Sequence, residues 1–238
     1  MSQSLDIVYV LREGENEELR YSLRSLEKNF KGINRVWFYG GKPSWLKSKN
    51  YVLVKQTGSK WQNTSTLYRN IVDNEDISED FILMNDDFFI LKPMQTLDYF
   101  YEGGLDKRVK RTFAKDVWGR NRQSRYGQLL QEANMWLKQN DYSNYNYEVH
   151  CPMVFNRHKL YKILEMFPAY GVGARRSLYG NIWRVGGQNL SRDCKLYPAD
   201  LIPPDIEEWQ FLSTTDIAFR GRVGNYIKTR FTEKSEWE

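Results

Sequence analysis

The sequence predicts an α/β protein, in which a mostly parallel sheet flanked by helices is followed by an elaborated, α-rich second half. Apolar runs typical of buried strands alternate with amphipathic helical patterns over residues 1–90. Such alternation favours a parallel sheet with helices on its faces. No internal repeat or low-complexity linker interrupts the 238 residues, so we expect a single domain over residues 1–238.

The first strands and the helix between them follow from apolar spacing. Asp6–Leu11 is an apolar run that predicts a strand, and Arg35–Tyr39 predicts the next one, closed by Gly40-Gly41. Between them, Glu15–Phe30 has the period of an amphipathic helix. The apolar face of this helix comprises Leu19, Leu23, Leu26 and Phe30.

The next elements lead to a pair of carboxylates. Tyr51–Lys55 predicts a short strand, Thr64–Asp73 a second helix, and Phe81–Met84 a fourth strand that ends at Asn85-Asp86-Asp87. In open α/β sheets, ligands bind at the carboxyl ends of the strands. Asp86 and Asp87 therefore stand where a ligand is expected.

The second half is less regular. We expect helices over Ser124–Lys138, Arg157–Phe167 and Val223–Phe231, and a polar loop over Asp141–Tyr147. Gly171–Gly187 is rich in Gly and Arg.

Charge and aromatic content indicate an anionic or sugar-like partner. The net charge is +5, the pI about 9.0, and aromatic residues make up 15% of the chain. Lys107–Arg125 is strongly basic and carries Phe113 and Trp118, with Tyr126 next to it. Such a stretch can bind a polyanion or be an ordinary solvated face.

Bulk features predict a cytoplasmic location. No stretch is long and apolar enough for a membrane span, and the N-terminus lacks signal-peptide features. Two cysteines do not make a disulfide framework, so a reducing cytoplasm is expected.

The acid pair has two interpretations. Asn85 and Asp86 can form an Asx-type turn at the strand end. Alternatively, Asp86 and Asp87 can hold a divalent cation, which in turn holds a diphosphate.

Four other residues are candidates for chemistry, each with a structural alternative. His150 can act as a general base or be a hydrogen-bonded structural histidine. Arg175 and Arg176 can clamp phosphate oxygens or lie in a solvated loop. Asp216 can join the acid pair or cap the terminal helix.

Segments along most of the chain resemble, in order, the four conserved blocks of the Stealth family. Members are sugar-nucleotide-dependent enzymes of capsular polysaccharide synthesis, and the lysosomal-enzyme GlcNAc-1-phosphotransferase belongs to the same group. The matching segments are Asp6–Val10 for the first block; Asn16–Lys28, Pro43–Leu46 and Glu79–Phe89 for the second; His150–Phe155 for the third; and Phe211–Asp216 with Lys234–Glu238 for the fourth. In its short length the chain resembles small phage- or bacterial-type members.

The resemblance implies a GT-A-like, Rossmann-like fold that uses a nucleotide-sugar donor, with a UDP-sugar expected, and a hydroxyl of a glycan-type acceptor. It places Asp86 and Asp87 at Mg²⁺ or Mn²⁺ and the donor diphosphate, and His150 at the catalytic base, with Asp87 also catalytic. Arg175 and Arg176 are the candidates for contact with the donor phosphates. Further candidate members of the site are Asn85, Asp216, Arg20 and Arg24.

One segment departs from the family, because Leu11–Glu15 lacks the aromatic residue and the Asp that usually end the first block. Glu13 is the expected substitute. Two alternatives to a glycan-directed transferase remain. One is a phage-type DNA-modifying glycosyltransferase that uses a nucleotide sugar. The other is a non-catalytic module that binds sugar nucleotides or glycans.

Overall fold

The computed structural model describes residues 5–113, 124–168 and 171–238. The strands are β1 (Leu5–Leu11), β2 (Ile33–Gly40), β3 (Tyr51–Leu53), β4 (Asp80–Asn85), β5 (Phe88–Ile90), β6 (Phe100–Tyr101), β7 (Met153–Asn156), β8 (Gln188–Asn189) and β9 (Phe211–Ser213). The α-helices are α1 (Glu17–Asn29), α2 (Lys60–Asp73), α3 (Leu105–Phe113), α4 (Arg125–Gln139), α5 (Arg157–Met166), α6 (Gly171–Ile182), α7 (Asp216–Phe219) and α8 (Arg222–Arg230).

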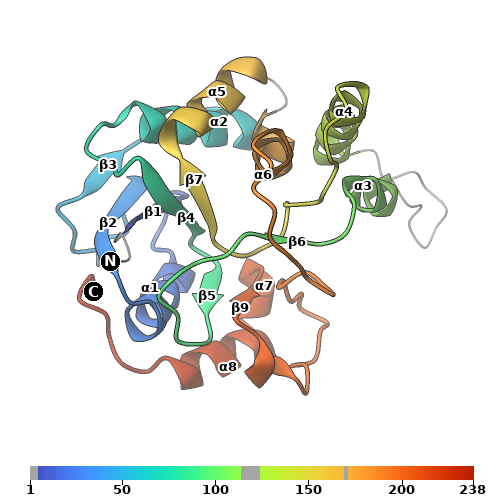
Figure 1. Ribbon diagram of the computed structural model, residues 1–238. Coiled ribbons are helices and arrows are strands. Elements are labelled where there is room, and N and C mark those ends of the chain that lie inside the picture. The colour runs from blue at the N-terminus through green and yellow to red at the C-terminus, as the bar shows by residue number, and fades with distance from the viewer. Residues whose placement is uncertain (1–4, 114–123, 169–170) are drawn as a thin grey trace.

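The main sheet has the strand order β3-β2-β1-β4-β7 (Figure 1). The first four strands in this order are parallel, and β7 runs antiparallel to β4 at one edge. The order 3-2-1-4 is that of one side of a Rossmann sheet. The predicted α/β class with a mostly parallel, helix-flanked sheet is therefore confirmed.

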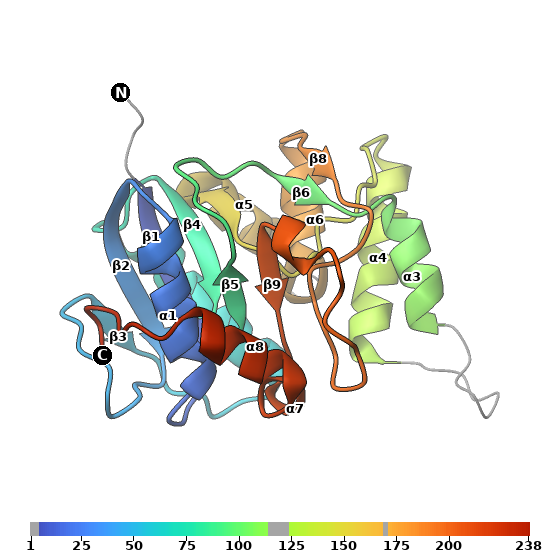
Figure 2. The same cartoon turned by 90° about the horizontal axis from the view of Figure 1, so that it is seen from below.

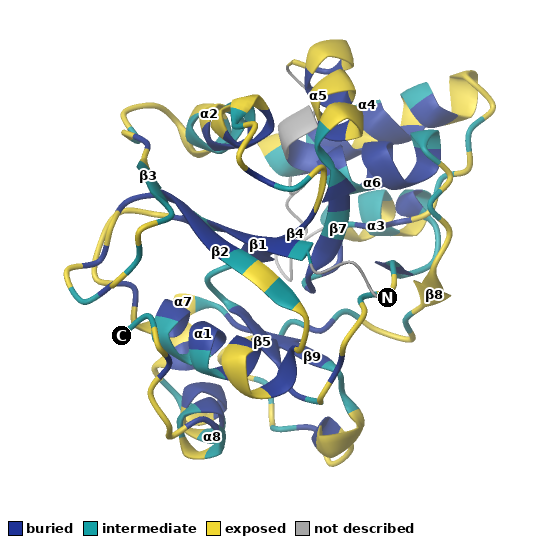
Figure 3. Ribbon diagram, turned by 60° about the vertical axis from the view of Figure 1, so that its left-hand side comes forward, coloured by how far each residue is buried: buried dark blue, intermediate teal, exposed yellow. Residues whose placement is uncertain are grey.

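Helices cover both faces of this sheet, because successive residues of a strand point to opposite sides. Val8 of β1 packs in a cluster with residues of α2, α4, α5 and α6. Its neighbours Ile7 and Tyr9 pack on the other face with Leu19 and Leu23 of α1. Figure 3 shows the buried sheet between α2 and α5 on one side and α1 on the other.

A two-stranded antiparallel ladder, β5 with β9, joins the two halves of the chain near α1 and α8 (Figure 2). Phe88, the first residue of β5, pairs with Ser213, the last residue of β9. Asp86 and Asp87 form the tight turn between β4 and β5. The acid pair therefore lies where the parallel sheet meets a strand from the second half.

The solvated-loop alternative for Arg175 and Arg176 is wrong, because residues 171–182 form α6. Its glycines permit close packing. A Cβ on Gly173 would lie 2.5 Å from the Leu129 side chain of α4, and one on Gly180 would lie 2.5 Å from the Tyr147 ring. Glycine is used here for close approach of the helix to its neighbours.

The other predicted helices are confirmed, with α2 beginning four residues earlier than expected, at Lys60 instead of Thr64. Within the described residues, no helix combines the length and the apolar character that a membrane crossing requires.

Candidate functional site

Asp86 is held from the first half of the chain. The Asn16 side-chain amide donates a hydrogen bond of 2.6 Å to Asp86 Oδ2. Asn16 is also the N-cap of α1, where its Oδ1 accepts the N–H of Leu19. Burial and the neighbouring charge of Asp87 raise the pKa of Asp86 to about 6.

Asp87 is held from the second half. Lys195 Nζ lies 3.0 Å from Asp87 Oδ2, and Ser213 Oγ donates to the same oxygen at 3.0 Å. Ser213 ends β9, and Lys195 forms a bridge to it in the backbone. Two adjacent carboxylates thus receive their partners from opposite ends of the sequence.

Glu18 is a third carboxylate that the sequence analysis missed. It is buried on α1 and accepts a hydrogen bond of 2.7 Å from Thr214 Oγ1. Burial raises the pKa of Glu18 to about 7, and the charges of Asp86 and Asp87 add to this effect. The expected substitute acid, Glu13, is exposed. The acid that joins the pair is therefore Glu18, in the first turn of α1.

Arg12 connects these acids to Asp216. Its guanidinium forms an ion pair with Asp216 and approaches Glu18 at 3.4 Å and Asp86 at 3.8 Å. Asp216 is the first residue of α7, whose N-cap is Thr215. The structure thus brings Asp216 to the acid pair through Arg12, while the capping role belongs to its neighbour.

His150 is oriented by a carboxylate that the sequence analysis also missed. Its Nδ1 lies 2.6 Å from Asp193 Oδ2, and its backbone N–H donates to Asp193 Oδ1 at 2.8 Å. Burial alone would raise the pKa of Asp193, but the hydrogen bonds and charge of His150 lower it to about 2. Asp193 is therefore an ionised partner that fixes the imidazole.

Asp193 and Lys195 bring the histidine and the acid pair into one site. The two residues are two positions apart in a segment that runs beside β9. Because Asp193 bonds His150 and Lys195 bonds Asp87, this short segment links both predicted catalytic residues.

The structure gives Arg175 and Arg176 other partners than a phosphate. Arg175 is 3% exposed, and its guanidinium lies 3.3 Å from the centre of the Tyr68 ring. Burial lowers the pKa of Arg175, and its Nε and Nη2 have no hydrogen-bond partner among the described residues. Such a buried group is poorly placed to contact a diphosphate at the acid turn.

Arg176 instead fastens the segment that carries His150. Its guanidinium donates to the backbone carbonyls of Val149 and Cys151, the residues on either side of His150. It also lies 5.6 Å from the centre of the Phe88 ring, which follows the acid turn. These contacts fit a residue that positions the histidine.

Arg20 and Arg24 point to the C-terminal segment. Arg24 donates to both carboxylate oxygens of Glu238, at 2.7 Å and 2.8 Å, and Arg20 donates to one of them at 3.2 Å. They are structural contacts of α1 in this fold. Asn85 ends β4 and is paired with Val10 in the sheet.

The basic stretch is divided. Residues 107–113 belong to α3, whereas residues 114–123, with Trp118, lie outside the described residues. Arg111 pairs with Glu102 at 2.8 Å, and Arg108 lies 3.9 Å from Asp193. The Tyr126 ring stacks on Trp61 with centroids 6.2 Å apart.

The acid pair suits a hard divalent cation by its chemistry. Mg²⁺ commonly binds through one or two carboxylates plus substrate phosphates, without a complete protein cage. Within the described ranges, no group of three or more His, Cys, Asp or Glu side chains is arranged as such a cage. The carboxylates of Asp86 and Asp87 therefore fit a metal that arrives with its phosphate ligand.

Comparison with solved structures gives a distant likeness. The chain is similar to a galactosyltransferase, LgtC, crystallised with donor and acceptor sugar analogues, at 10% identity and a TM-score of 0.47, over 98% of each chain. It is also similar to the glycosyltransferase GlyE of Streptococcus pneumoniae, at 10% identity and a TM-score of 0.34, over 79% of this chain and 45% of the other.

Sequence comparison gives more specific relatives. The receptor polysaccharide phosphotransferase WefC of Streptococcus gordonii is 29% identical over 43% of this chain and 36% of its own length. An exopolysaccharide phosphotransferase of Nocardia farcinica is 28% identical over 47% of this chain and 24% of its own length. The matches thus span about a third or less of each relative. Residues 12–108, which include Glu18 and the acid turn, match the model of Stealth protein CR2, conserved region 2. Over these residues the chain is therefore similar to conserved region 2 of the Stealth family.

Proposed function

We propose that this protein transfers a sugar phosphate, or a sugar, from a nucleotide-sugar donor to a hydroxyl group of a glycan acceptor. The observation that carries the proposal is the His150–Asp193 pair, which the Asp193–Lys195 segment connects to Asp87. A base oriented by a carboxylate, next to an acid pair, is the arrangement that transfer to a hydroxyl requires. The phosphotransferase names of the relatives support the same class.

His150 acts as the general base in this proposal. With Nδ1–H donated to Asp193, its Nε2 is free to accept a proton from the acceptor hydroxyl. Asp193 stays ionised, since its pKa is about 2, and stabilises the imidazolium that forms.

Asp86 and Asp87 would hold Mg²⁺ or Mn²⁺, which supplies Lewis-acid stabilisation of the donor diphosphate. The chain's own cations lie at the same place, because Lys195 bonds Asp87 and Arg12 lies 3.8 Å from Asp86. These cations are positioned to offset negative charge on the leaving phosphate.

Two bond changes are compatible with this site. Attack of the acceptor oxygen on the β-phosphorus breaks its bond to the bridging oxygen, transfers a sugar phosphate and releases a nucleoside monophosphate. Attack on the anomeric carbon transfers the sugar and releases a nucleoside diphosphate. In both, the acceptor proton passes to His150. The names of the relatives favour the first.

The test is a panel of UDP-sugars and other nucleotide sugars with Mg²⁺ or Mn²⁺ and oligosaccharide acceptors, read by the nucleotide released. We expect His150→Ala and Asp86→Ala to lose turnover. His158→Ala removes the other histidine, which is exposed on α5, and should keep it. Turnover that survives in both site variants would refute the assignment.

The same experiment separates the two alternatives. Donor binding by calorimetry without turnover, for every acceptor, would favour a non-catalytic module. A DNA acceptor is less well supported, since Arg108 faces Asp193 and Tyr126 is stacked on Trp61. Binding of duplex DNA with a steep salt dependence would revive it.

A further inference from the structure

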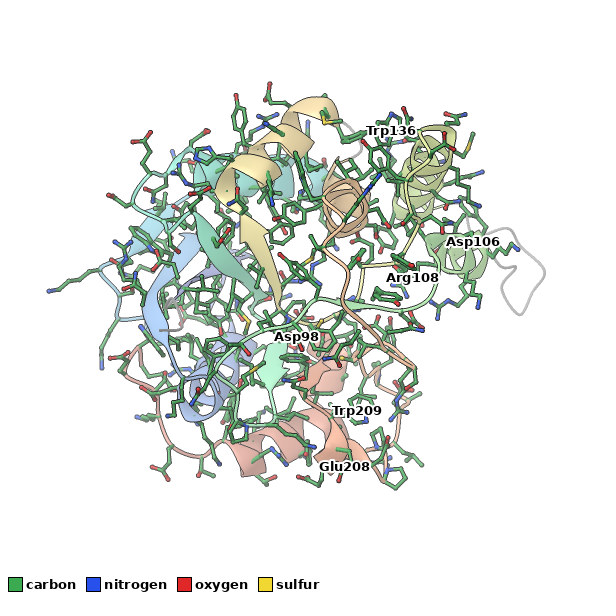
Figure 4. All side chains as sticks on the ribbon, viewed as in Figure 1. Asp98, Asp106, Arg108, Trp136, Glu208 and Trp209 are labelled. Atoms are coloured by element: carbon green, nitrogen blue, oxygen red, sulfur yellow. The ribbon has the colours of Figure 1, made fainter. Side chains whose placement is uncertain are left out.

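A pocket of about 410 Å³ opens in the second half of the chain, beside the proposed reaction centre. Its basic side chains come from two regions, with Arg108 and Arg111 on α3 and Arg192 and Lys195 on the segment before β9. Trp209 adds an aromatic wall. Figure 4 labels Arg108 and Trp209, which come from these different regions. This volume is in the range of small-molecule sites.

The deep end of the pocket is formed by the residues that hold the proposed catalytic groups. Asp193 and Lys195 line it, and each is 15% exposed. Asp193 bonds His150, and Lys195 bonds Asp87. A ligand that fills the pocket therefore ends next to the residues that hold both groups.

Two accessible arginines stand at the outer end of the pocket, where the carboxylates Glu102 and Asp200 also contribute to its lining. The Arg111 and Arg192 side chains are 52% and 49% exposed. Arg192 uses one Nη to bond Asp205, and Arg111 uses two nitrogens to bond Glu102. A guanidinium has five N–H donors, so both arginines keep donors for a further anion.

The same pocket also has an apolar surface. Leu201 is 70% exposed and Tyr197 is 50% exposed, although both are large hydrophobic side chains. An aromatic ring such as that of Tyr197 packs on the apolar face of a sugar while its polar edge stays solvated. Cations beside exposed apolar groups thus match a sugar that carries an acidic substituent.

We propose that this pocket is the acceptor subsite and that it binds an anionic saccharide, one that bears a phosphate or a carboxylate. The inference rests on the proposed transferase function. The donor is expected at the carboxyl ends of β1, β2 and β4, which leaves the pocket of the second half for the acceptor. The anionic group would then lie between Arg111 and Arg192, and the acceptor would extend past Asp193 and Lys195 so that its hydroxyl reaches Nε2 of His150.

Binding in the absence of donor tests the pocket independently of turnover. Glucose 6-phosphate, glucuronic acid and glucose are titrated by calorimetry. We expect both anionic sugars to bind at least about tenfold more tightly than glucose, since charge-assisted hydrogen bonds are the strong ones. Arg192→Gln should weaken both by about three- to tenfold. A matched control is Lys92→Gln, which removes a surface cation paired with Glu208 outside the lining, and should change neither.

Equal binding of the three sugars, or binding unaffected by Arg192→Gln, would overturn the proposal. A preference for glucose 6-phosphate alone would assign a phosphate-bearing sugar, and a preference for glucuronic acid alone a carboxylate-bearing one. The role as acceptor subsite is then tested with donor present, where anionic acceptors should show the lower KM. Nucleotide release without this preference refutes the subsite and leaves the transferase function intact. Anion binding without nucleotide release for any acceptor refutes the transferase function and, with it, the acceptor role.

Discussion

Asp86 and Asp87 are neighbours in one turn, yet two different regions of the molecule hold them. Asp86 is bonded by Asn16 of the regular first half. Asp87 is bonded by Lys195 and Ser213 of the irregular second half. The geometry of the acid pair therefore depends on contacts from both halves. A change in one half can displace one carboxylate while the other carboxylate stays in place.

The two regions also order their backbones differently. Continuous parallel ladders of β1, β2 and β4 position Asn16 and the acid turn. Around His150, side chains and not strand ladders hold the backbone in place. Arg176 donates to the carbonyls of the residues on both sides of His150, and Asp193 accepts the His150 N–H. Substitutions at the contacts around His150 should thus change activity most, and those at contacts of α1 away from the acid turn should change stability most.

The largest effect is expected from Asp193→Asn. The amide has nearly the same volume, but its NH₂ group facing Nδ1 would favour the tautomer in which Nε2 carries the hydrogen and cannot accept a proton. We expect kcat to fall by roughly 10²- to 10⁴-fold, the contribution of a general base, with the donor KM little changed. Asp98→Asn, an exposed carboxylate bonded to Gln188, is the control. An unchanged kcat would remove Asp193 from the mechanism.

Arg176→Lys comes next and separates two roles. Lysine keeps the charge but cannot donate to two carbonyls with the planar geometry of a guanidinium. If Arg176 positions His150, kcat should fall by about ten- to a hundredfold with the donor KM unchanged. If it instead contacts the donor phosphates, as the sequence suggested, the donor KM should rise. Steady-state kinetics with varied donor distinguishes the two.

The regular half could be predicted closely from sequence because its signals are local. The alternation of Ile7, Val8 and Tyr9 between two faces, and the spacing of Leu19 and Leu23, encode strand and helix within a few residues. The position of Asp86 and Asp87 could be predicted because they directly follow the apolar strand β4.

The second half resisted prediction because its partners are distant in sequence. Asp193 is 43 residues from His150, and Ser213 is 126 residues from Asp87. The helix α6 was missed because Gly173 and Gly180, read as loop signals, permit contact with Leu129 and Tyr147. One sequence signal could have identified Glu18 as a site residue. It lies near the start of a helix that follows the end of a strand, where ligands bind in α/β sheets.

Glu238→Gln tests the expectation that contacts of α1 away from the acid turn affect stability and not activity. It weakens the bonds from Arg24 and Arg20, and the Glu238 side chain is 1% exposed. We expect a loss of about 2 kcal/mol in the free energy of unfolding, measured by urea denaturation, with turnover unchanged. A fall in turnover would return Arg20 and Arg24 to the site.

The pH dependence of that loss has a definite sign. Burial raises the pKa of Glu238, but the Arg24 hydrogen bonds dominate and lower it from 4.5 to about 2. A lowered pKa gives stabilisation that is present above pH 4.5 and is lost as the pH falls toward 2. The difference between wild type and Glu238→Gln should therefore shrink over that range. A difference that stays constant would exclude the charged pair as its cause.

The smallest effect comes from comparing two substitutions at Asn16. Its φ is +46°, a left-handed conformation that glycine adopts freely and alanine does not. Both Asn16→Gly and Asn16→Ala lose the cap to Leu19 and the bond to Asp86. Their difference in unfolding free energy thus isolates backbone strain, which we expect to destabilise the alanine variant by about 1 kcal/mol more. Equal stabilities of the two variants by urea denaturation would mean that the left-handed backbone at residue 16 adds no strain. Side-chain bonds alone would then hold Asp86 in place, as side-chain bonds hold His150 in the second half.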